Sequence, residues 1–184
     1  MQIVLIGAQG TGKTSVMNAL PQDLKQYGIR EVIRNMTSID ANVQINQNGN
    51  EISQNRFFFE YLYLFSKYNE YISDRGLLDV CAYTKWLVSM GNVHEEVYNK
   101  QIYILKEWMR THPKIIHVYF PIYFPVKDDG YRDTNEENRK QVDQCIQDVI
   151  EELMNEGLWN GYQIDNCTVK ERVDCIVKTV EMYG

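Results

Sequence analysis

Residues 7–14, GAQGTGKT, combine the residue types that hold the phosphates of a nucleoside triphosphate. They fit the pattern GxxxxGK(S/T) at every position and follow the apolar run 3–6. The glycines allow dihedrals that direct backbone N–H groups inward, Lys13 can reach the outer phosphates, and the Thr14 hydroxyl can ligate Mg²⁺. The residues expected to bind the nucleotide are Gly7, Ala8, Gln9, Gly10, Thr11, Gly12, Lys13, Thr14 and Ser15.

A second group of candidate residues is the segment SDRGLLD, residues 73–79, at the end of an expected strand. The Asp74 carboxylate can hold Mg²⁺ or orient a substrate hydroxyl, and Arg75 can bind an anionic substrate. Glu31 and Arg34 repeat the acid and arginine pair near the end of the preceding strand. Two such pairs beside a triphosphate loop favour a phosphorylated acceptor, although a turn with an ion pair is the alternative for each. The expected substrate-binding residues are Glu31, Arg34, Arg75 and Asp79, and the expected metal ligands are Thr14 and Asp74.

A third segment, residues 127–140, is polar, contains a glycine and leads into an expected helix. Its Arg132 and Arg139 could neutralise the transferring phosphoryl group from a closing lid, which would also exclude water. A solvated charged loop is the alternative.

The elements that must position these residues alternate along the chain as in a parallel α/β sheet. The expected strands are 2–6, 29–33, 70–73, 114–120 and 162–164, and helices are expected to begin near Lys13, Arg56, Leu77, Val93, Thr134 and Thr168. Thr134 with Glu137 and Thr168 with Glu171 fit the capping box. Residues 35–55 are rich in Asn and Gln and are expected to form a mobile loop on the acceptor side, with a dispensable surface insertion as the alternative. The aromatic run 57–65, FFFEYLYLF, demands burial on more than one side of its helix; core packing is expected, and a homodimer interface is the alternative.

Length and composition predict a single domain, residues 1–184, with a core of its own, since 44% of the 184 residues are hydrophobic. The net charge of −6, without a long basic run, argues against polymeric nucleic acid and membrane surfaces as partners. The four cysteines form no CxxC pair, no signal peptide is recognised, and no apolar run approaches ~20 residues, so we expect a cytoplasmic location. His94, His112 and His117 have no neighbouring ligand cluster, and no histidine metal site is expected.

Beyond these motifs, the chain resembles the nucleoside and nucleoside-monophosphate kinase group of P-loop proteins. REVIR at 30–34, ISDRGLLDVCAY at 72–83, DDGYRDTNEENRKQVD at 128–143 and VKERVD at 169–174 resemble a family of small phage and bacterial ATP-binding proteins of the AAA type. That family includes thymidylate-kinase-like and nicotinamide-riboside-kinase-like members.

The resemblance implies a P-loop three-layer sandwich, with a five-stranded parallel sheet in the order 2-3-1-4-5, helices on both faces and a lid. It also implies ATP and Mg²⁺ as cofactors, and an acceptor over the second and third strand ends. On this basis Asp74 and Arg75 would act at the metal and the acceptor, and Glu31 would be an acceptor-site carboxylate. The catalytic residues would be Lys13, Asp74, Arg132 and Arg139. Two departures concern the acceptor: Gly76 stands where many thymidylate kinases carry a bulky or hydroxyl residue, and the loop 35–55 has no recognised counterpart.

The resulting hypothesis is an ATP-dependent phosphotransferase that acts on a small molecule, a (deoxy)nucleoside monophosphate, in a bacterial cell or a phage-infected host. A nucleoside or nicotinamide riboside kinase is the nearest alternative, because a carboxylate such as Glu31 or Asp74 would orient an acceptor hydroxyl. A nucleotide-dependent switch or ATPase binding module is an alternative of another class.

Overall fold

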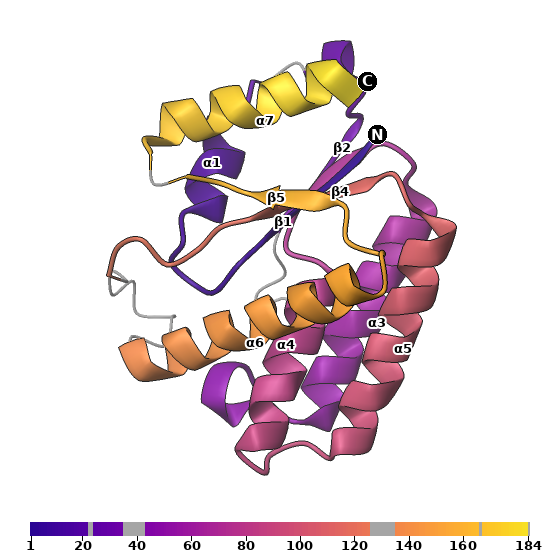
Figure 1. The fold of residues 1–184 in the computed structure, drawn as a ribbon, viewed down its shortest axis with the longest axis vertical. Helices are drawn as coiled ribbons and strands as arrows, with labels where there is room; N and C mark the ends of the chain where they lie inside the picture. Colours follow the sequence, from indigo (N-terminus) through magenta and orange to yellow (C-terminus); the bar gives the residue numbers. More distant parts are fainter. Residues whose placement is uncertain (22–23, 35–42, 126–134, 166, 184) are drawn as a thin grey trace.

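Five parallel strands form one sheet in the computed structural model, which describes residues 1–21, 24–34, 43–125, 135–165 and 167–183. The strands are β1 (Gln2–Ile6), β2 (Glu31–Ile33), β3 (Tyr71–Asp74), β4 (Ile115–Tyr119) and β5 (Gly161–Gln163). Their order across the sheet is β2-β3-β1-β4-β5, which confirms the predicted order. Leu5 lies opposite Asp74 and Ile6 lies opposite Tyr119, so the carboxyl ends of β1, β3 and β4 meet at one edge (Figure 1).

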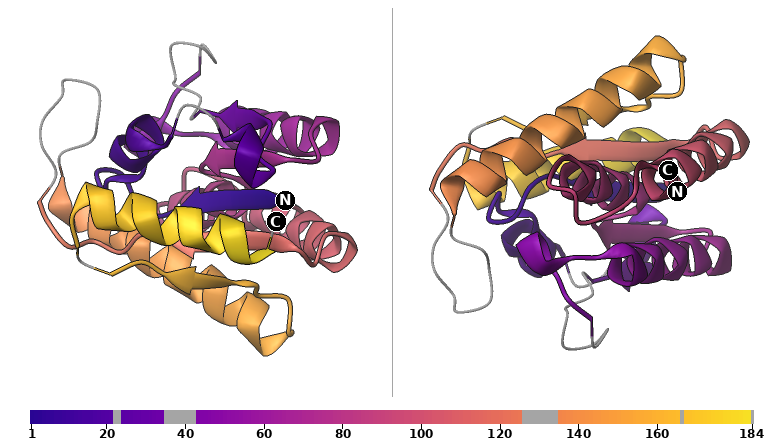
Figure 2. Two further views of the ribbon diagram at one scale, coloured as in Figure 1. Left: turned by 90° about the horizontal axis from the view of Figure 1, so that it is seen from above. Right: turned by 90° about the horizontal axis from the view of Figure 1, so that it is seen from below.

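Helices cover both faces of the sheet, as expected for parallel strands that are buried on both sides. One face carries α1 (Lys13–Ala19) and α7 (Val169–Tyr183), and the other carries α3 (Glu51–Lys67), α4 (Leu77–Ser89), α5 (Glu95–Thr111) and α6 (Glu136–Asn155). Side chains of β1 alternate between the two faces: Ile3 and Leu5 belong to the core under α1 and α7, and Val4 and Ile6 to the core under the other helices. Figures 1 and 2 show the resulting three layers. Within the described ranges, no helix is long and apolar enough to cross a membrane.

Residues 43–55 are more regular than the sequence predicts. Helix α3 begins at Glu51 rather than near Arg56, because Asn50 and Ser53 form a reciprocal cap. The Asn50 side chain accepts the Ser53 N–H at 3.0 Å, and the Ser53 hydroxyl accepts the Asn50 N–H at 2.9 Å. A short 3₁₀ helix, η2 (Asn46–Asn48), precedes this cap, and another, η1 (Lys25–Tyr27), precedes β2. The prediction of a loop is therefore wrong for 51–55, and residues 35–42 lie outside the described part of the chain.

The sequence predicts the cap of the last helix, α7, correctly, but not the cap of α6. Helix α6 begins at Glu136, and its cap is Asn135, whose side chain accepts the N–H groups of Glu137 and Asn138. Thr134 lies outside the described residues. At the start of α7 the predicted capping box is confirmed: the Thr168 N–H donates to the Glu171 carboxylate at 2.8 Å, and the Glu171 N–H donates to the Thr168 hydroxyl at 3.3 Å.

The aromatic run on α3 is buried on one side only. Phe58, Tyr61 and Phe65 are buried, and the Phe65 ring stacks on Tyr71 at the start of β3. Phe59 and Tyr63 are 56% and 58% exposed, so the expectation of burial on more than one side is wrong. The reason is that α3 packs on α4 and lies at the margin of its helical layer (Figure 2), which leaves its outer face to solvent.

His117, in the middle of β4, is buried in the core, and this burial changes its pKa. It is 4% exposed, its ring stacks on Trp159 with centroids 5.5 Å apart, and its Nδ1 has no hydrogen-bond partner among the described residues. Burial lowers the pKa of His117 from 6.5 to about 4. Because folding lowers this pKa, the unfolded state binds the proton more tightly than the folded state does. The free energy of unfolding is therefore highest above pH 6.5 and falls as the pH drops toward 4.

We expect His117 to account for a loss of about 2 kcal/mol in the free energy of unfolding between pH 7 and pH 5. A His117→Phe variant keeps a ring against Trp159 but does not titrate. Urea unfolding of both proteins at the two pH values checks this. Equal pH dependence in wild type and variant would show that His117 is not the responsible group.

Candidate active site

The phosphate loop, residues 7–14, connects β1 to α1 at the carboxyl edge of the sheet. Gly7 and Gly12 have φ values of 147° and 93°, a region that side chains rarely occupy. A Cβ atom on Gly7 would also lie 2.5 Å from the Phe120 carbonyl oxygen at the end of β4. The glycines of the motif are therefore required by both dihedral angle and close packing.

Lys13, the first residue of α1, folds back across the loop. Its ammonium donates to the carbonyl oxygens of Gly7 at 2.7 Å and Ala8 at 2.8 Å, and to the Thr11 hydroxyl at 3.1 Å. The side chain is nearly buried, at 4% exposure. Its positive charge is therefore held in the loop, where the sequence predicts the outer phosphates of a nucleotide. Ser15, the third residue of α1, is exposed.

The structure brings Thr14 and Asp74 together. The Thr14 hydroxyl, from the first turn of α1, donates to the Asp74 carboxylate at 2.8 Å. Asp74 ends β3 and is 3% exposed, whereas Thr14 is exposed to solvent. A hydroxyl and a carboxylate are hard oxygen ligands of the kind that Mg²⁺ prefers, and Mg²⁺ commonly takes its other ligands from substrate phosphates and water. The pair therefore fits the predicted metal ligands.

Asp79 and Arg75 face the phosphate loop rather than the crevice beyond it. Asp79, 1% exposed in the first turn of α4, accepts the N–H groups of Gly7 at 3.0 Å and Gly76 at 3.1 Å. Arg75 donates to the Gly7 carbonyl at 3.3 Å, and its guanidinium lies over the Tyr83 ring. Burial raises the pKa of Asp79, and the charges of Arg75 and Lys13 oppose this rise. In the structure both residues support the loop from beneath.

The second strand places Arg34 at the site and Glu31 away from it. Glu31 is the first residue of β2 and pairs with Tyr71, the first residue of β3. At ~3.3 Å per residue, this position is about 10 Å from the strand end that carries Asp74. The prediction places Glu31 at the carboxyl end of the strand, but Glu31 is the residue of β2 farthest from that end, so it does not join the other candidate residues. Arg34 follows β2 on the carboxyl side and donates to Asn18 of α1 at 2.7 Å.

The two predicted lid arginines have different outcomes. Arg132 lies outside the described residues, as does most of the segment 127–140, whose last residues form the first turn of α6. Arg139 is fully buried and donates to the carbonyl oxygens of Gln9 at 2.8 Å and Gly10 at 3.4 Å. It also donates to the carbonyl of Phe124 at 2.8 Å. In the structure Arg139 therefore contacts the backbone of the phosphate loop.

Sequence reasoning missed Arg172 as a residue of this site. It lies in the first turn of α7, is 2% exposed and donates to the Thr11 carbonyl at 3.0 Å. A Cβ atom on Gly12 would lie 3.1 Å from its guanidinium. The capping box at Thr168 and Glu171 predicts the start of this helix, but nothing in the local pattern indicates that the next residue reaches the phosphate loop.

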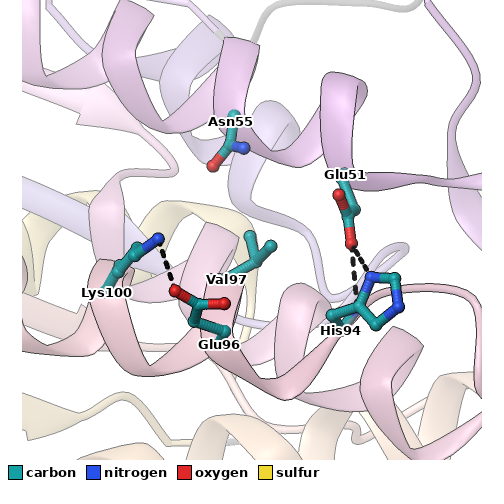
Figure 3. Close-up of a pocket in the computed structure, with 6 residues that line it drawn as sticks. All are labelled: Glu51, Asn55, His94, Glu96, Val97 and Lys100. Atoms are coloured by element: carbon teal, nitrogen blue, oxygen red, sulfur yellow. Dashed lines mark hydrogen bonds and ion pairs between the residues drawn. The ribbon is translucent and has the colours of Figure 1, made fainter.

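A cavity of about 280 Å³ lies elsewhere, between the N-terminal ends of α3 and α5 (Figure 3). Glu51 of α3 accepts hydrogen bonds from the backbone and ring of His94, and Lys100 pairs with Glu96 at 2.8 Å. None of the predicted site residues lines this cavity. Across the described ranges, no group of three or more His, Cys, Asp or Glu side chains is arranged to hold a metal ion. The loop and the carboxyl edge of the sheet thus remain the candidate active site.

Comparison with solved structures shows the same fold in several kinases. Deoxyadenosine kinase from M. mycoides has a TM-score of 0.65 at 16% identity, over 99% of this chain and 100% of that one. Thymidylate kinase from Candida albicans has a TM-score of 0.64 at 13% identity, over 98% of this chain and 91% of that one. The NadR protein in complex with NR has a TM-score of 0.64 at 16% identity, over 98% of this chain but 50% of that one. No curated protein sequence matches the chain.

The family described as AAA domain matches residues 2–159, which include the phosphate loop, Asp74 and Arg139. This match spans most of the sequence, and the structural neighbours show the fold that goes with it. The chain therefore belongs to the AAA domain family and is a P-loop protein with the fold of the nucleoside and nucleotide kinases.

Proposed function

We propose that this protein transfers the γ-phosphate of ATP to a (deoxy)nucleoside monophosphate. The observation that carries the proposal is the Thr14 hydroxyl bonded to the Asp74 carboxylate beside a complete phosphate loop. A triphosphate held by the loop would have its outer phosphates next to this pair and to the Lys13 ammonium. Such an arrangement suits transfer of the terminal phosphoryl group.

The proposal gives the loop and the residues around it distinct parts. Backbone N–H groups of residues 8–14 would bind phosphate oxygens, Lys13 would exchange its carbonyl partners for the outer phosphates, and Thr14 with Asp74 would hold Mg²⁺. The metal, when bound, neutralises charge that develops on the phosphates during transfer. Arg132 and the segment 127–140 would close over the transferring group, and Asp79 and Arg75 keep the loop in shape from below.

The position of Arg34 supports a phosphorylated acceptor. Ile33 pairs with Ser73, so Arg34 follows beside Asp74 at the carboxyl edge, with an exposed guanidinium. Acceptors in open α/β sheets bind beyond this edge. Among the similar structures, the thymidylate kinase from Candida albicans is named for an acceptor that is a nucleoside monophosphate.

The orientation of Arg75 favours a second candidate, an unphosphorylated nucleoside or nicotinamide riboside as acceptor. Arg75 is engaged by the Gly7 carbonyl, Asp79 and the Tyr83 ring, so one fewer arginine faces the acceptor. Asp74 would then orient the acceptor hydroxyl. The NadR structure, which contains NR, fits this candidate.

The deciding experiment measures ATP consumption with Mg²⁺ against a panel of nucleosides and nucleoside monophosphates, with products identified by mass. A diphosphate formed from a monophosphate supports the proposal. A monophosphate formed from a nucleoside replaces it with the second candidate. Hydrolysis without any acceptor would instead indicate a nucleotide-dependent switch or ATPase module.

Arg34→Ala is expected to raise the KM for a monophosphate acceptor about tenfold and to leave the KM for ATP unchanged, because a charge-assisted contact to phosphate is lost. The matched control is Arg30→Ala. Arg30 precedes β2, pairs with Glu70 and lies at the opposite end of the strand. Equal acceptor KM values for both variants would remove Arg34 from the acceptor site.

Two further expectations accompany the proposal. The exposed apolar residues Ile52, Phe59 and Tyr63 on the outer face of α3 support a homodimer, which light scattering of the purified protein tests directly.

The four cysteines are free thiols, which supports a reducing cytoplasm as the place of action.

A further inference from the structure

The backbone carbonyls of the phosphate loop face away from the phosphates, and each needs a hydrogen-bond donor. A loop that directs its N–H groups inward must direct its carbonyls outward. Here every carbonyl from residue 7 to residue 11 accepts a hydrogen bond from a cationic side chain. Lys13 donates to residues 7 and 8, Arg139 to residues 9 and 10, and Arg172 to residue 11. Arg75 also donates to residue 7, so four cationic side chains hold the carbonyls of the loop.

Arg172 differs from Arg139 in having no counter-charge among the described residues. Arg139 forms an ion pair with Glu136 at 3.1 Å. Among the described residues, no carboxylate lies within ion-pair distance of Arg172, although its side chain is 2% exposed. Its Nε and Nη2 atoms also have no hydrogen-bond partner within the described part of the chain.

Three aromatic rings surround the Arg172 guanidinium. Its Cζ lies 5.7 Å from the centroid of Phe120, 5.8 Å from Tyr123 and 5.5 Å from Phe124. These rings fix the planar group by cation–π attraction, but they do not replace a negative charge. A buried cation without a counter-charge in the described part of the chain is costly for folding, so its retention beside the loop calls for a source of negative charge.

We propose that Arg172 is a positioning residue for the donor nucleotide. It fixes the Thr11 carbonyl, which keeps the adjacent loop N–H groups directed at the phosphates, and it places a buried positive charge behind the loop. The polyphosphate supplies the missing negative charge when it binds. The affinity for the triphosphate then depends on a residue of α7 that does not touch it. This inference rests on the proposed function, since it requires the loop to bind a nucleoside triphosphate.

The test compares wild type, Arg172→Met and Arg172→Lys by calorimetric titration with ATP and with inorganic triphosphate, both with Mg²⁺ and without acceptor. We expect Arg172→Met to raise the Kd for both ligands about tenfold, because a charge-assisted contact that orders the loop is lost. Arg172→Lys restores the charge but not the planar group, and is expected to recover part of the affinity for both. Arg110→Met is the control, since Arg110 is exposed and pairs with Glu107 and Glu156, away from the loop.

The outcomes separate this inference from the proposed function. Wild-type protein that binds neither ligand contradicts both. Wild-type binding together with unchanged Kd values in Arg172→Met, whatever its melting temperature, refutes the role of Arg172 alone. Weaker binding of ATP with unchanged binding of inorganic triphosphate also refutes it, because Arg172 would then act on the base. If Arg172→Met does not fold, Arg172→Lys decides: a higher Kd for both ligands supports the role, and wild-type Kd values refute it.

Discussion

Lys13→Met is expected to lower kcat at least ~10³-fold, the largest effect of any single substitution considered for this protein. The methionine side chain keeps most of the length and apolar character of lysine but removes the charge that the loop holds between Gly7, Ala8 and Thr11. Charge that spreads over the transferring phosphoryl group would then have no ammonium to stabilise it. A kinase assay under saturating ATP and acceptor measures the loss.

Lys85→Met is the matched control, because Lys85 is a partly exposed lysine whose ion pair with Asp148 lies between α4 and α6. It should retain kcat within about twofold, as is usual for an exposed ion pair. If Lys13→Met retained comparable activity, the loop would not act on the transferring group, and the proposed reaction would have to be abandoned.

Asp74→Asn is expected to lower kcat about 10²-fold and to raise the Mg²⁺ concentration needed for half-maximal rate. Asparagine preserves the shape of the side chain and can still accept the Thr14 hydroxyl, so the fold should be unaffected. The neutral amide is a weaker ligand for a hard divalent cation. Initial rates measured over a Mg²⁺ titration separate the two parameters.

Asp148→Asn serves as the control for Asp74, since Asp148 pairs with Lys85 far from the loop. An unchanged Mg²⁺ requirement in Asp74→Asn, alongside a lower kcat, would point to a role in orienting the acceptor hydroxyl instead. That result would favour the nucleoside as acceptor.

The parts of the site that follow from strand ends could be predicted from the sequence. Thr14 and Asp74 are brought together because β1 and β3 are neighbours in the sheet: Asp74 is the last residue of β3, and the phosphate loop leads from the same end of β1 to Thr14 in α1. The same reasoning was wrong for Glu31, because it depends on which end of a three-residue strand a side chain occupies. The expected strand 29–33 and β2 both end at Ile33, so the error lies in assigning Glu31 to that end of the strand.

The roles of the buried arginines could not be predicted in the same way. Arg139 lies 130 residues from Gln9, and Arg172 lies 161 residues from Thr11. Their contacts depend on how α6 and α7 pack on the sheet, and an arginine in a polar sequence gives no sign that it will be buried. The polar composition of 127–140 predicts solvent exposure, yet its Arg139 is fully buried.

The packing around residue 76 gives a physical reason for the glycine at this position, where many thymidylate kinases carry a bulky or hydroxyl residue. A Cβ atom there would lie 2.8 Å from a Val4 methyl group and 3.0 Å from the Phe65 ring. The glycine therefore allows α3 to approach β1 closely, and a bulky or hydroxyl residue at this position would require the aromatic ring to move.

The hydrogen bonds to the loop carbonyls also constrain the order in which this protein becomes functional during its synthesis. The phosphate loop is synthesised before its partners, because its Gly7 N–H donates to Asp79, 72 residues later, and its Thr11 carbonyl accepts from Arg172, 161 residues later. Contacts of such high sequence separation form late, because a long chain must be closed before they contribute. A ribosome-bound chain that ends before α7 would carry the complete sequence motif with a loop that is only partly supported.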